Sequence, residues 1–241
     1  MYPVICQIGP VHVYSYGVMM AVAVIICSLL LSKDAPRAGL KPDQIFDFMF
    51  WVVLGGIIGA RIFFILLNLS YFLSNPSEIF KVYHGGLAWQ GGLMAGIVVS
   101  WLYIRRKGWA LLPTLDFLAP YIALGQAIGR IGCFLNGCCY GREVAWGIYS
   151  PAQDATLHPT QLYDSIGLLI IFFILRRYGW VSQKAGQVFT AYLLLASAQR
   201  FVIEFFRADH GILWVGLSIF QVISLLVFVA AVYFNLYIRF R

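Results

Sequence analysis

Charged residues are scarce in this chain: of its 241 residues only 11% are Asp, Glu, Lys or Arg, and 61% are hydrophobic. Soluble domains carry about 25% charged residues, so the composition excludes an ordinary soluble protein. Long polar connections are also lacking, because the one sizeable connection covers residues 131–160. The sequence therefore predicts a single membrane domain over residues 1–241, with a small outer loop region at 131–160.

The N-terminal segment lacks lysine and arginine ahead of the apolar run that begins near Val18. A cleaved signal peptide starts with a positively charged region, so we expect this run to remain as a span. A span needs about 20 mainly apolar residues, and lipid-facing backbone must be helical to pair its polar groups. Apolar stretches lie approximately at residues 14–32, 45–69, 87–104, 111–129, 161–175, 186–206 and 215–238. The predicted fold class is all-α, a polytopic membrane protein with about seven transmembrane helices.

Lysine and arginine gather on alternate connections between these stretches. Eleven of the 17 follow the first, third and fifth stretch or end the chain: Lys33, Arg37, Lys41, Arg105, Arg106, Lys107, Arg176, Arg177, Lys184, Arg239 and Arg241. The positive-inside rule makes that side cytoplasmic, which places the N-terminus outside and the C-terminus in the cytoplasm. The net charge of +7 thus reflects topology and contact with anionic lipid heads, and no nucleic-acid partner is expected.

Three arginines, Arg61, Arg130 and Arg200, lie within predicted spans or at the outer face, where orientation does not explain them. An arginine at the bilayer centre costs about 2.5–3.5 kcal/mol, so such residues usually face a partner or a polar cavity. Glu204 comes four residues after Arg200, so the two side chains share one face of a helix. We expect Glu204 to pair with Arg200 and orient it without contacting the substrate itself. We expect these arginines to belong to the functional site, and we expect Arg61 to contribute to phospholipid binding.

A glycine-rich segment at residues 84–92 contains His84, the pair Gly85 and Gly86, and Gln90. Glycines let backbone N–H groups approach a ligand closely, and the N-terminus of a following helix attracts anions. We interpret this segment as a site for a lipid phosphate. A flexible turn before a tightly packed helix is the alternative.

A second glycine-rich segment, where the fourth span meets the outer loop, places Arg130, Asn136 and Gly141 at the depth of the lipid heads. Arginine binds phosphate through paired hydrogen bonds, so this is the strongest local indication of a phosphate site. A purely structural Arg130, paired with a carboxylate such as Asp116 or Glu204, is the alternative.

The sequence His158-Pro159-Thr160 opens the fifth span. Proline is tolerated at a helix start, and Thr160 can cap the helix, so both residues are interpreted as architecture. His158 and Asp164 are expected to support the site from behind, although a histidine that merely lies at the membrane interface is the alternative.

Three of the five cysteines, Cys133, Cys138 and Cys139, lie near the outer face on the predicted topology. That face is oxidising, so we expect a disulfide from Cys133 to Cys138 or Cys139. Three thiols without a nearby spaced histidine are a weak indication of zinc, and no metal is expected. Cys27 lies within the first span and is expected to pack as a small apolar side chain.

In this order on seven spans, these segments resemble the phosphatidylglycerol prolipoprotein diacylglyceryl transferase family. The segments that carry the resemblance are Tyr16-Gly17, Asn75-Pro76-Ser77-Glu78, His84-Gly85-Gly86, Gly129-Arg130, His158-Pro159-Thr160-Gln161-Leu162-Tyr163 and Arg200 to Glu204. The resemblance implies an enzyme of the bacterial inner (cytoplasmic) membrane, surrounded by membrane lipids, that acts on phosphatidylglycerol. It implies transfer of the diacylglyceryl group to the lipobox cysteine in the signal-peptide region of a prolipoprotein, without a metal or soluble cofactor.

The resemblance also implies residue roles. Arg130 would hold the phosphate and Arg200 would guard or assist the reaction, while Tyr16, Asn136 and Gly141 would line the site. An incoming thiol must approach its thiolate form to attack carbon, and the leaving phosphate needs cationic stabilisation. We take Arg130, Arg200 and Tyr16, together with a base, as the catalytic candidates.

The base is where this sequence departs from the family pattern. The family usually has a histidine where this chain has Gln90, and a glutamine cannot take a proton at neutral pH. Cys133, Cys138 and Ala196 stand where asparagine, glutamate and tyrosine are usual. Either His84 helps to deprotonate the acceptor thiol, or the protein is a divergent relative. In the latter case it is a membrane thiol/disulfide redox protein or a non-catalytic phospholipid-binding protein.

Overall fold

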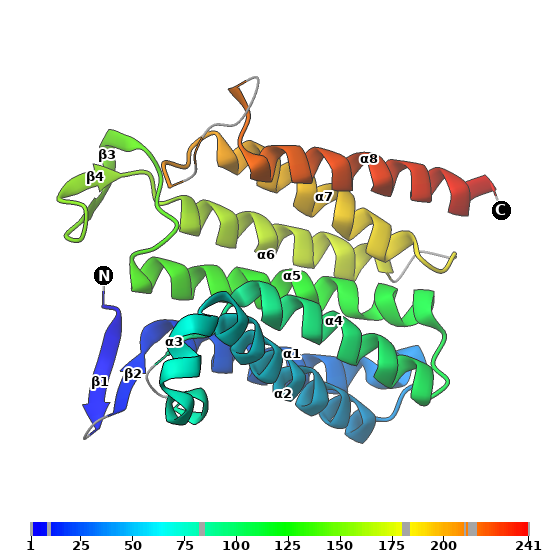
Figure 1. Cartoon of the computed structure of the whole chain (residues 1–241). Helices are drawn as coiled ribbons and strands as arrows, with labels where there is room; N and C mark the ends of the chain where they lie inside the picture. Colours follow the sequence, from blue (N-terminus) through cyan, green and yellow to red (C-terminus); the bar gives the residue numbers. More distant parts are fainter. Residues whose placement is uncertain are drawn as a thin grey trace. The chain divides into compact units, whose positions relative to one another are not determined.

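The computed structural model describes residues 2–8, 11–81, 85–179, 184–209, 211 and 216–240, and helices dominate this part of the chain (Figure 1). The long helices are α1 (Ser15–Asp34), α2 (Pro42–Leu67), α4 (Trp89–Arg106), α5 (Leu111–Asn136), α6 (Thr160–Gly179), α7 (Gln187–Glu204) and α8 (Ile219–Phe240). The shorter elements are α3 (Leu69–Ser74), η1 (Ala35–Ala38), η2 (Pro76–Phe80) and two paired-strand hairpins, β1 (Val4–Ile8) with β2 (Val11–Tyr14) and β3 (Glu143–Ser150) with β4 (Ala155–Leu157). Each predicted apolar stretch coincides with one long helix.

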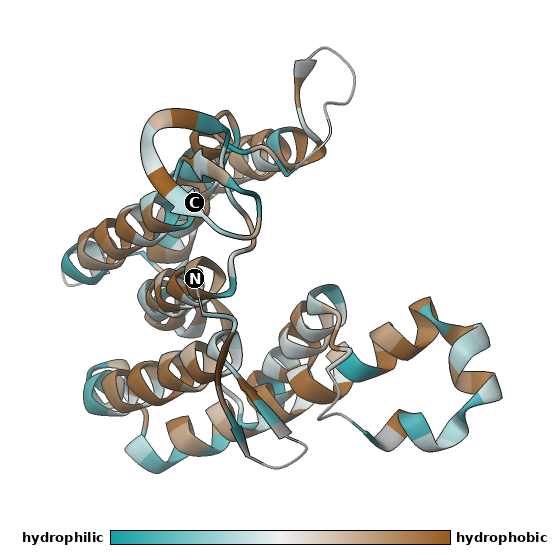
Figure 2. Ribbon diagram, turned by 90° about the vertical axis from the view of Figure 1, so that its left-hand side faces the viewer, coloured by the Kyte–Doolittle hydropathy of each residue, from teal (hydrophilic) through white to brown (hydrophobic). Residues whose placement is uncertain are grey.

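Among the described residues, four helices are long and apolar enough to cross a membrane by length and composition: Ser15–Ala38, Pro42–Leu67, Leu111–Asn136 and Ile219–Ile238. The other long helices, α4, α6 and α7, are less hydrophobic on average. Hydrophobic residues make up much of the helical ribbon (Figure 2). The predicted all-α polytopic membrane fold is confirmed, while the number of spans and the sides of the termini remain predictions.

The chain divides into two compact units, which we describe separately. One comprises residues 1–6, 13–27 and 112–241, and the other comprises residues 7–12 and 28–111. That the two form a single membrane domain remains a prediction.

In the unit of residues 28–111, α2 packs against α4 through glycines. A Cβ atom on Gly59 would lie 2.2 Å from Ala95 Cβ, and one on Gly55 would lie 2.6 Å from Val99 Cγ2. Small residues allow such close helix approach in membranes. Gly96 differs, because no atom lies within 4 Å of the Cβ that it would carry.

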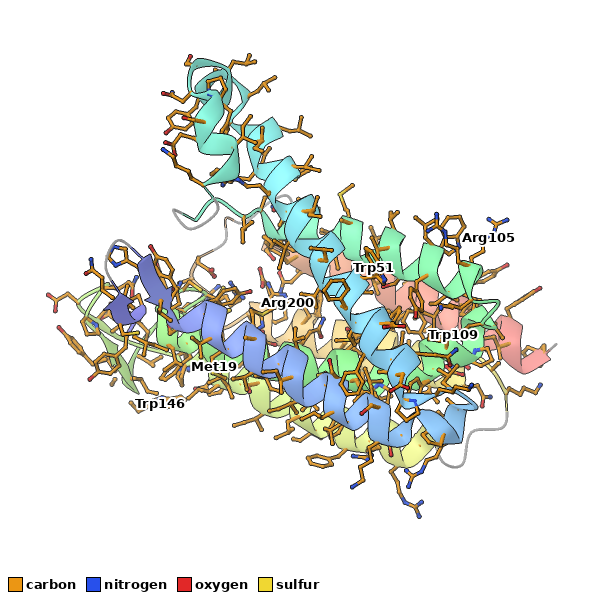
Figure 3. The ribbon with its side chains drawn as sticks, turned by 90° about the horizontal axis from the view of Figure 1, so that it is seen from below. Met19, Trp51, Arg105, Trp109, Trp146 and Arg200 are labelled. Carbon is orange, nitrogen blue, oxygen red and sulfur yellow. The ribbon has the colours of Figure 1, made fainter. Side chains whose placement is uncertain are left out.

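One end of this unit is rich in aromatic and basic side chains. The rings of Phe48 and Trp109 both pack on Tyr103, each with centroids 5.5 Å apart. Arg105 lies at the same end as Trp109 (Figure 3), with its guanidinium 5.3 Å from the ring of Trp101. Aromatic rings with basic residues are typical of the cytoplasmic ends of transmembrane helices.

In the other unit, α5 to α8 lie side by side and alternate in direction (Figure 1). The carboxylate of Asp116 accepts hydrogen bonds from the backbone N–H groups of Gly186 (2.5 Å) and Phe189 (2.8 Å), which ties α5 to the start of α7. The first half of α1 packs on α5, where a Cβ on Gly132 would lie 3.2 Å from the Tyr16 ring. The alternation brings the end of α5, the start of α6, the end of α7 and the start of α8 to one end of this unit.

Candidate active site

A chain of alternating arginines and carboxylates joins three helices at this end. Arg130 Nε on α5 lies 3.0 Å from Asp164 Oδ2 on α6, and the same oxygen lies 3.9 Å from Arg200 Nη1 on α7. Arg200 Nη2 in turn lies 2.7 Å from Glu204 Oε2. We call Arg130, Asp164, Arg200 and Glu204 the charged cluster; Figure 3 labels Arg200 within the helices. Its two positive charges balance its two negative charges, which limits the cost of removing them from water.

The pairing confirms one expectation and changes another. Glu204 pairs with Arg200, as their spacing predicted. The carboxylate that Arg130 meets is Asp164, whereas Asp116 is engaged with α7 backbone.

Two further side chains hold the carboxylates in place. Gln199 Nε2 donates to the backbone oxygen of Asp164 (2.9 Å) and to its Oδ1 (3.1 Å). Ser218 Oγ donates to Glu204 Oε1 at 2.7 Å. Sequence reasoning missed Gln199 and Ser218, because their roles depend on which faces of α6, α7 and α8 meet, and residue type alone does not signal this.

Some polar atoms in and beside the charged cluster can still donate or accept a hydrogen bond. Arg200 Nη1 and Gln199 Oε1 are buried and have no hydrogen-bond partner among the described residues. Arg130 forms its ion pair with Asp164 through Nε, and the Arg130 side chain is 25% exposed. Buried polar atoms are normally paired, so this geometry suits a ligand that brings oxygen atoms.

The turn that ends α5 closes as a Schellman motif. Gly137 has φ +76°, its N–H donates to Phe134 O (3.2 Å), and the N–H of Cys138 donates to Cys133 O (3.2 Å). This pattern requires a left-handed residue after the helix, which glycine adopts readily. The motif folds Cys138 back over Cys133.

The sulfur atoms of Cys133, Cys138 and Cys139 lie within 4.8 Å of one another. All five cysteines of the chain, each a described residue, are free, so the expected disulfide is absent from this structure. The turn is anchored to the start of α6, where Thr160 Oγ1 donates to Cys139 O (2.9 Å) and Gln161 Nε2 donates to Cys138 O (2.7 Å). Thr160 therefore ties α6 to this turn rather than capping its own helix.

Arg207 brings positive charge to the same turn. It is buried, and its guanidinium donates two hydrogen bonds, of 2.9 and 2.6 Å, to the carboxylate of Asp209. Hydrogen bonds from the thiols of Cys133 and Cys138, together with the charge of Arg207, lower the pKa of the Cys139 thiol. A hydrogen bond with Cys139 and burial raise the pKa of the Cys138 thiol, so the turn favours negative charge on Cys139 and not on Cys138.

The predicted lining residues take different places. The phenol of Tyr16 lies within electrostatic range of Arg130, and Asn136 lies within hydrogen-bonding reach of Cys138. Gly141 is enclosed by protein instead: a Cβ there would lie 2.5 Å from His158 Cβ and 2.7 Å from the backbone oxygen of Phe206. Their contact with a substrate remains a prediction.

His158 packs among aromatic rings. Its centroid lies 4.9 Å from that of Trp146 and 5.4 Å from that of Phe206, and its Nδ1 lies 3.2 Å from the hydroxyl of Tyr163. This environment agrees with a histidine that shapes the loop region.

In the unit of residues 28–111, Arg61 holds a loop. Its guanidinium donates to the backbone oxygens of Glu78 (2.5 Å), Ile79 (3.1 Å), Gly85 (2.8 Å) and Gly86 (3.0 Å). The side chain is buried, so these carbonyls replace water around its charge. Its contribution to phospholipid binding, like that of the two glycines, remains a prediction.

Gln90 is the second residue of α4 and is exposed, close to the helix N-terminus. His84, the candidate base, lies outside the described residues. Their proposed functions remain predictions.

A family model described as prolipoprotein diacylglyceryl transferase matches residues 3–237. The chain belongs to this transferase family. A Clostridium tetani protein named phosphatidylglycerol–prolipoprotein diacylglyceryl transferase is 33% identical over 100% of this chain and 99% of its own length. Proteins of the same name from Clostridioides difficile (36% identical) and Geobacter sulfurreducens (35%) cover 92% of this chain, and the matches span 90% and 89% of their own lengths.

Three positions that the sequence analysis singled out lie in the same unit as the charged cluster. Cys133 and Cys138 belong to the thiol group at the end of α5, and Ala196 lies one turn before Arg200 on α7. Their effect on the reaction remains a prediction.

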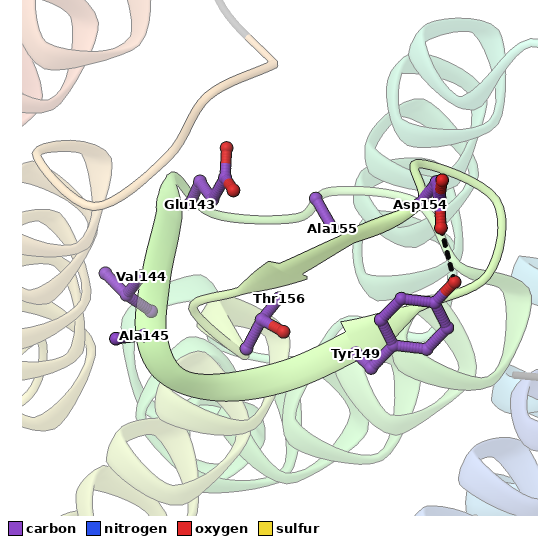
Figure 4. A pocket seen from close by; sticks show the side chains of 7 residues that line it. All are labelled: Glu143, Val144, Ala145, Tyr149, Asp154, Ala155 and Thr156. Atoms are coloured by element: carbon purple, nitrogen blue, oxygen red, sulfur yellow. Dashed lines mark hydrogen bonds between the residues drawn. The ribbon is translucent and has the colours of Figure 1, made fainter.

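A separate hollow of about 640 Å³ lies on the β3–β4 hairpin (Figure 4). It is lined by Glu143, Val144, Ala145, Tyr149, Asp154, Ala155 and Thr156. The hydroxyl of Tyr149 donates to Asp154 Oδ1 across it at 2.5 Å. None of these lining residues belongs to the charged cluster.

Proposed function

We propose that this protein transfers the diacylglyceryl group of phosphatidylglycerol to the lipobox cysteine thiol of a prolipoprotein, at the outer side of a bacterial inner membrane. Family membership supports the reaction class. The observation that carries the proposal is Arg130, a partly exposed guanidinium held by Asp164 beside Arg200. This arrangement offers fixed positive charge to a lipid phosphate.

The reaction places new negative charge on the phosphate. The acceptor thiol first loses its proton to a base or to water. Its sulfur then forms a bond to the glyceryl carbon, and the bond from that carbon to the phosphate oxygen breaks. The electron pair leaves with oxygen, so glycerol phosphate gains one unit of negative charge. Preorganised cations aimed at such developing charge lower the barrier, and Arg130 is placed to provide it.

The carboxylates of the cluster supply the preorganisation. Asp164 accepts from Arg130 and lies near Arg200, while Glu204 holds Arg200 from the other side. Guanidinium groups fixed before substrate binds need little reorganisation in the transition state. We therefore assign Asp164 and Glu204 to positioning and the arginines to the phosphate.

The test is reconstitution of the full chain in phosphatidylglycerol vesicles with a synthetic lipobox peptide. Mass spectrometry should detect a peptide heavier by one diacylglyceryl group, attached as a thioether. A peptide with serine in place of the lipobox cysteine and vesicles of phosphatidylethanolamine are the matched controls. Lack of product from the cysteine peptide, with protein that remains folded, would contradict the proposal.

A further inference from the structure

The three thiols at the end of α5 have the geometry of a metal site. Zinc binds thiolate sulfur at about 2.3 Å, so two thiolates on a tetrahedral zinc lie about 3.8 Å apart. The sulfurs of Cys133, Cys138 and Cys139 lie within 4.8 Å of one another. Small side-chain rotations therefore suffice to bring the three onto one ion.

The backbone holds this group in place at a conformational cost. Cys139 has φ +62°, a left-handed conformation that non-glycine residues seldom adopt. The carbonyls of Cys138 and Cys139 are fixed by Gln161 and Thr160, whose side chains are almost wholly buried. Such strain persists where surrounding structure enforces it and is concentrated at functional sites.

Two arginines and a tyrosine lie close to the thiols. Arg207 is buried and lies within hydrogen-bonding reach of Cys139. Arg130 stands three residues before Cys133 on the same face of α5, a separation of about 4.5 Å along the axis. The phenol of Tyr16 is within electrostatic range of Arg130 and of all three thiols. The thiol group thus adjoins the phosphate site.

We infer that Cys133, Cys138 and Cys139 bind one zinc ion through three thiolates, and that its fourth position takes the acceptor cysteine of the prolipoprotein. The inference rests on the proposed transferase function. Catalytic zinc sites have three protein ligands and an open position, as this group provides among the described residues. Cys138 and Cys139 are partly exposed, which leaves that position accessible.

The zinc would take over the task for which this chain lacks the usual histidine. A thiol that coordinates zinc loses its proton, here to water at the membrane surface, and becomes a bound thiolate. Its sulfur attacks the glyceryl carbon, the carbon–oxygen bond to phosphate breaks, and the electron pair leaves on glycerol phosphate beside Arg130. The neutral thioether is a weak ligand and dissociates, so no oxidant or reductant is consumed.

Cobalt substitution tests the site without relying on turnover. The full chain, purified under reducing conditions and loaded with Co²⁺, should bind one ion and show the thiolate charge-transfer and tetrahedral d–d absorption bands. A lipobox peptide should shift the d–d bands, whereas its serine counterpart should not. A Co²⁺ spectrum without sulfur bands, or with no response to the cysteine peptide, would overturn the inference.

Serine substitutions provide the residue-level test. Cys133→Ser, Cys138→Ser and Cys139→Ser should each weaken zinc binding at least tenfold, measured by competition with a chromogenic chelator. Cys6→Ser, on exposed β1, is the matched control and should bind zinc as the unmodified chain does. Circular dichroism and gel filtration in detergent identify any variant that has not folded, and an equal loss in the control would contradict the assignment.

Removal of zinc separates this inference from the proposed function. Metal-free protein should lose at least tenfold in rate and recover when zinc is restored. Full product formation by metal-free protein, or a thiol count that reveals a disulfide in the active protein, would overturn the zinc site and leave the transferase standing. A zinc-loaded protein that binds the cysteine peptide but forms no product would contradict the transferase instead.

Discussion

Arg130 Nε on α5 lies 3.0 Å from Asp164 Oδ2 on α6. The same carboxylate oxygen lies 3.9 Å from Arg200 on α7, so one aspartate sets the spacing of two arginines from different helices. A phosphate that binds Arg130 would therefore contact a cation whose position depends on α5, α6 and α7 together. The predictions below test this relationship and the packing around it.

Arg130→Lys should reduce the rate of product formation by about 10²–10³-fold, because lysine keeps the charge but cannot offer paired N–H groups to phosphate and to Asp164. Initial rates in phosphatidylglycerol vesicles measure the effect. Arg37→Lys is the control, since Arg37 is largely exposed and pairs with Asp34, which is not a member of the charged cluster. Equal rates for the Arg130→Lys variant and the unmodified chain would rule out the phosphate role.

Asp164→Asn should leave Arg130 and Arg200 without their shared negative partner and lower the thermal unfolding midpoint in detergent. The expected loss is about 2 kcal/mol, typical of a hydrogen bond to a charged group. The maximal rate should also fall, because the arginines are no longer held in register. Glu143→Gln, on the loop hairpin, serves as a charge-matched control. An Asp164→Asn variant with normal rate and stability would show that the aspartate does not position the arginines.

Gly59→Ala should destabilise the unit of residues 28–111, because the new methyl group would lie 2.2 Å from Ala95 Cβ. Forced overpacking costs about 1–3 kcal/mol. Gly96→Ala offers a matched comparison, since no atom lies within 4 Å of its added methyl group. Thermal unfolding in detergent should separate the two variants, and equal midpoints would refute the close packing of α2 on α4.

Gln90→Ala should reduce the rate by less than about tenfold, because glutamine cannot act as the base and contributes at most hydrogen bonds to the substrate. The expectation tests the interpretation, made from the family resemblance, that Gln90 takes the place of a histidine. Initial rates at several phosphatidylglycerol contents would separate binding from chemistry. A loss as large as that of the Arg130→Lys variant would place Gln90 in the chemical step.

The helices and one ion pair were predictable from sequence. Hydrophobic length places each long helix, and the four-residue spacing predicts that Glu204 pairs with Arg200. The partner of Arg130 was not predictable, since Asp164 meets it only through the relative rotation of α5 and α6. The contact of Gln199 with Asp164 depends on register in the same way.

The thiol group shows a different limit of sequence reasoning. Three cysteines near a predicted oxidising face suggested a disulfide, whereas the structure gathers all three as free thiols. The gathering depends on the Schellman turn at Gly137 and on the left-handed backbone at Cys139. Residue types alone do not specify such a turn.

The predicted orientation has its own test. Basic residues on alternate connections place the C-terminus in the cytoplasm. A reporter that is active only in the cytoplasm, fused after Arg241, should therefore be active, and one that is active only outside should be silent. The opposite pattern would move the charged cluster to the wrong side for an exported prolipoprotein.

The account is tested most directly by measuring both products of one reaction. Vesicles with the full chain, phosphatidylglycerol and a lipobox peptide should release glycerol phosphate and form thioether-linked diacylglyceryl peptide in equal amounts, and Arg130→Ala should suppress both together. Glycerol phosphate without modified peptide, or equal product from the Arg130→Ala variant, would contradict a transferase centred on this cluster.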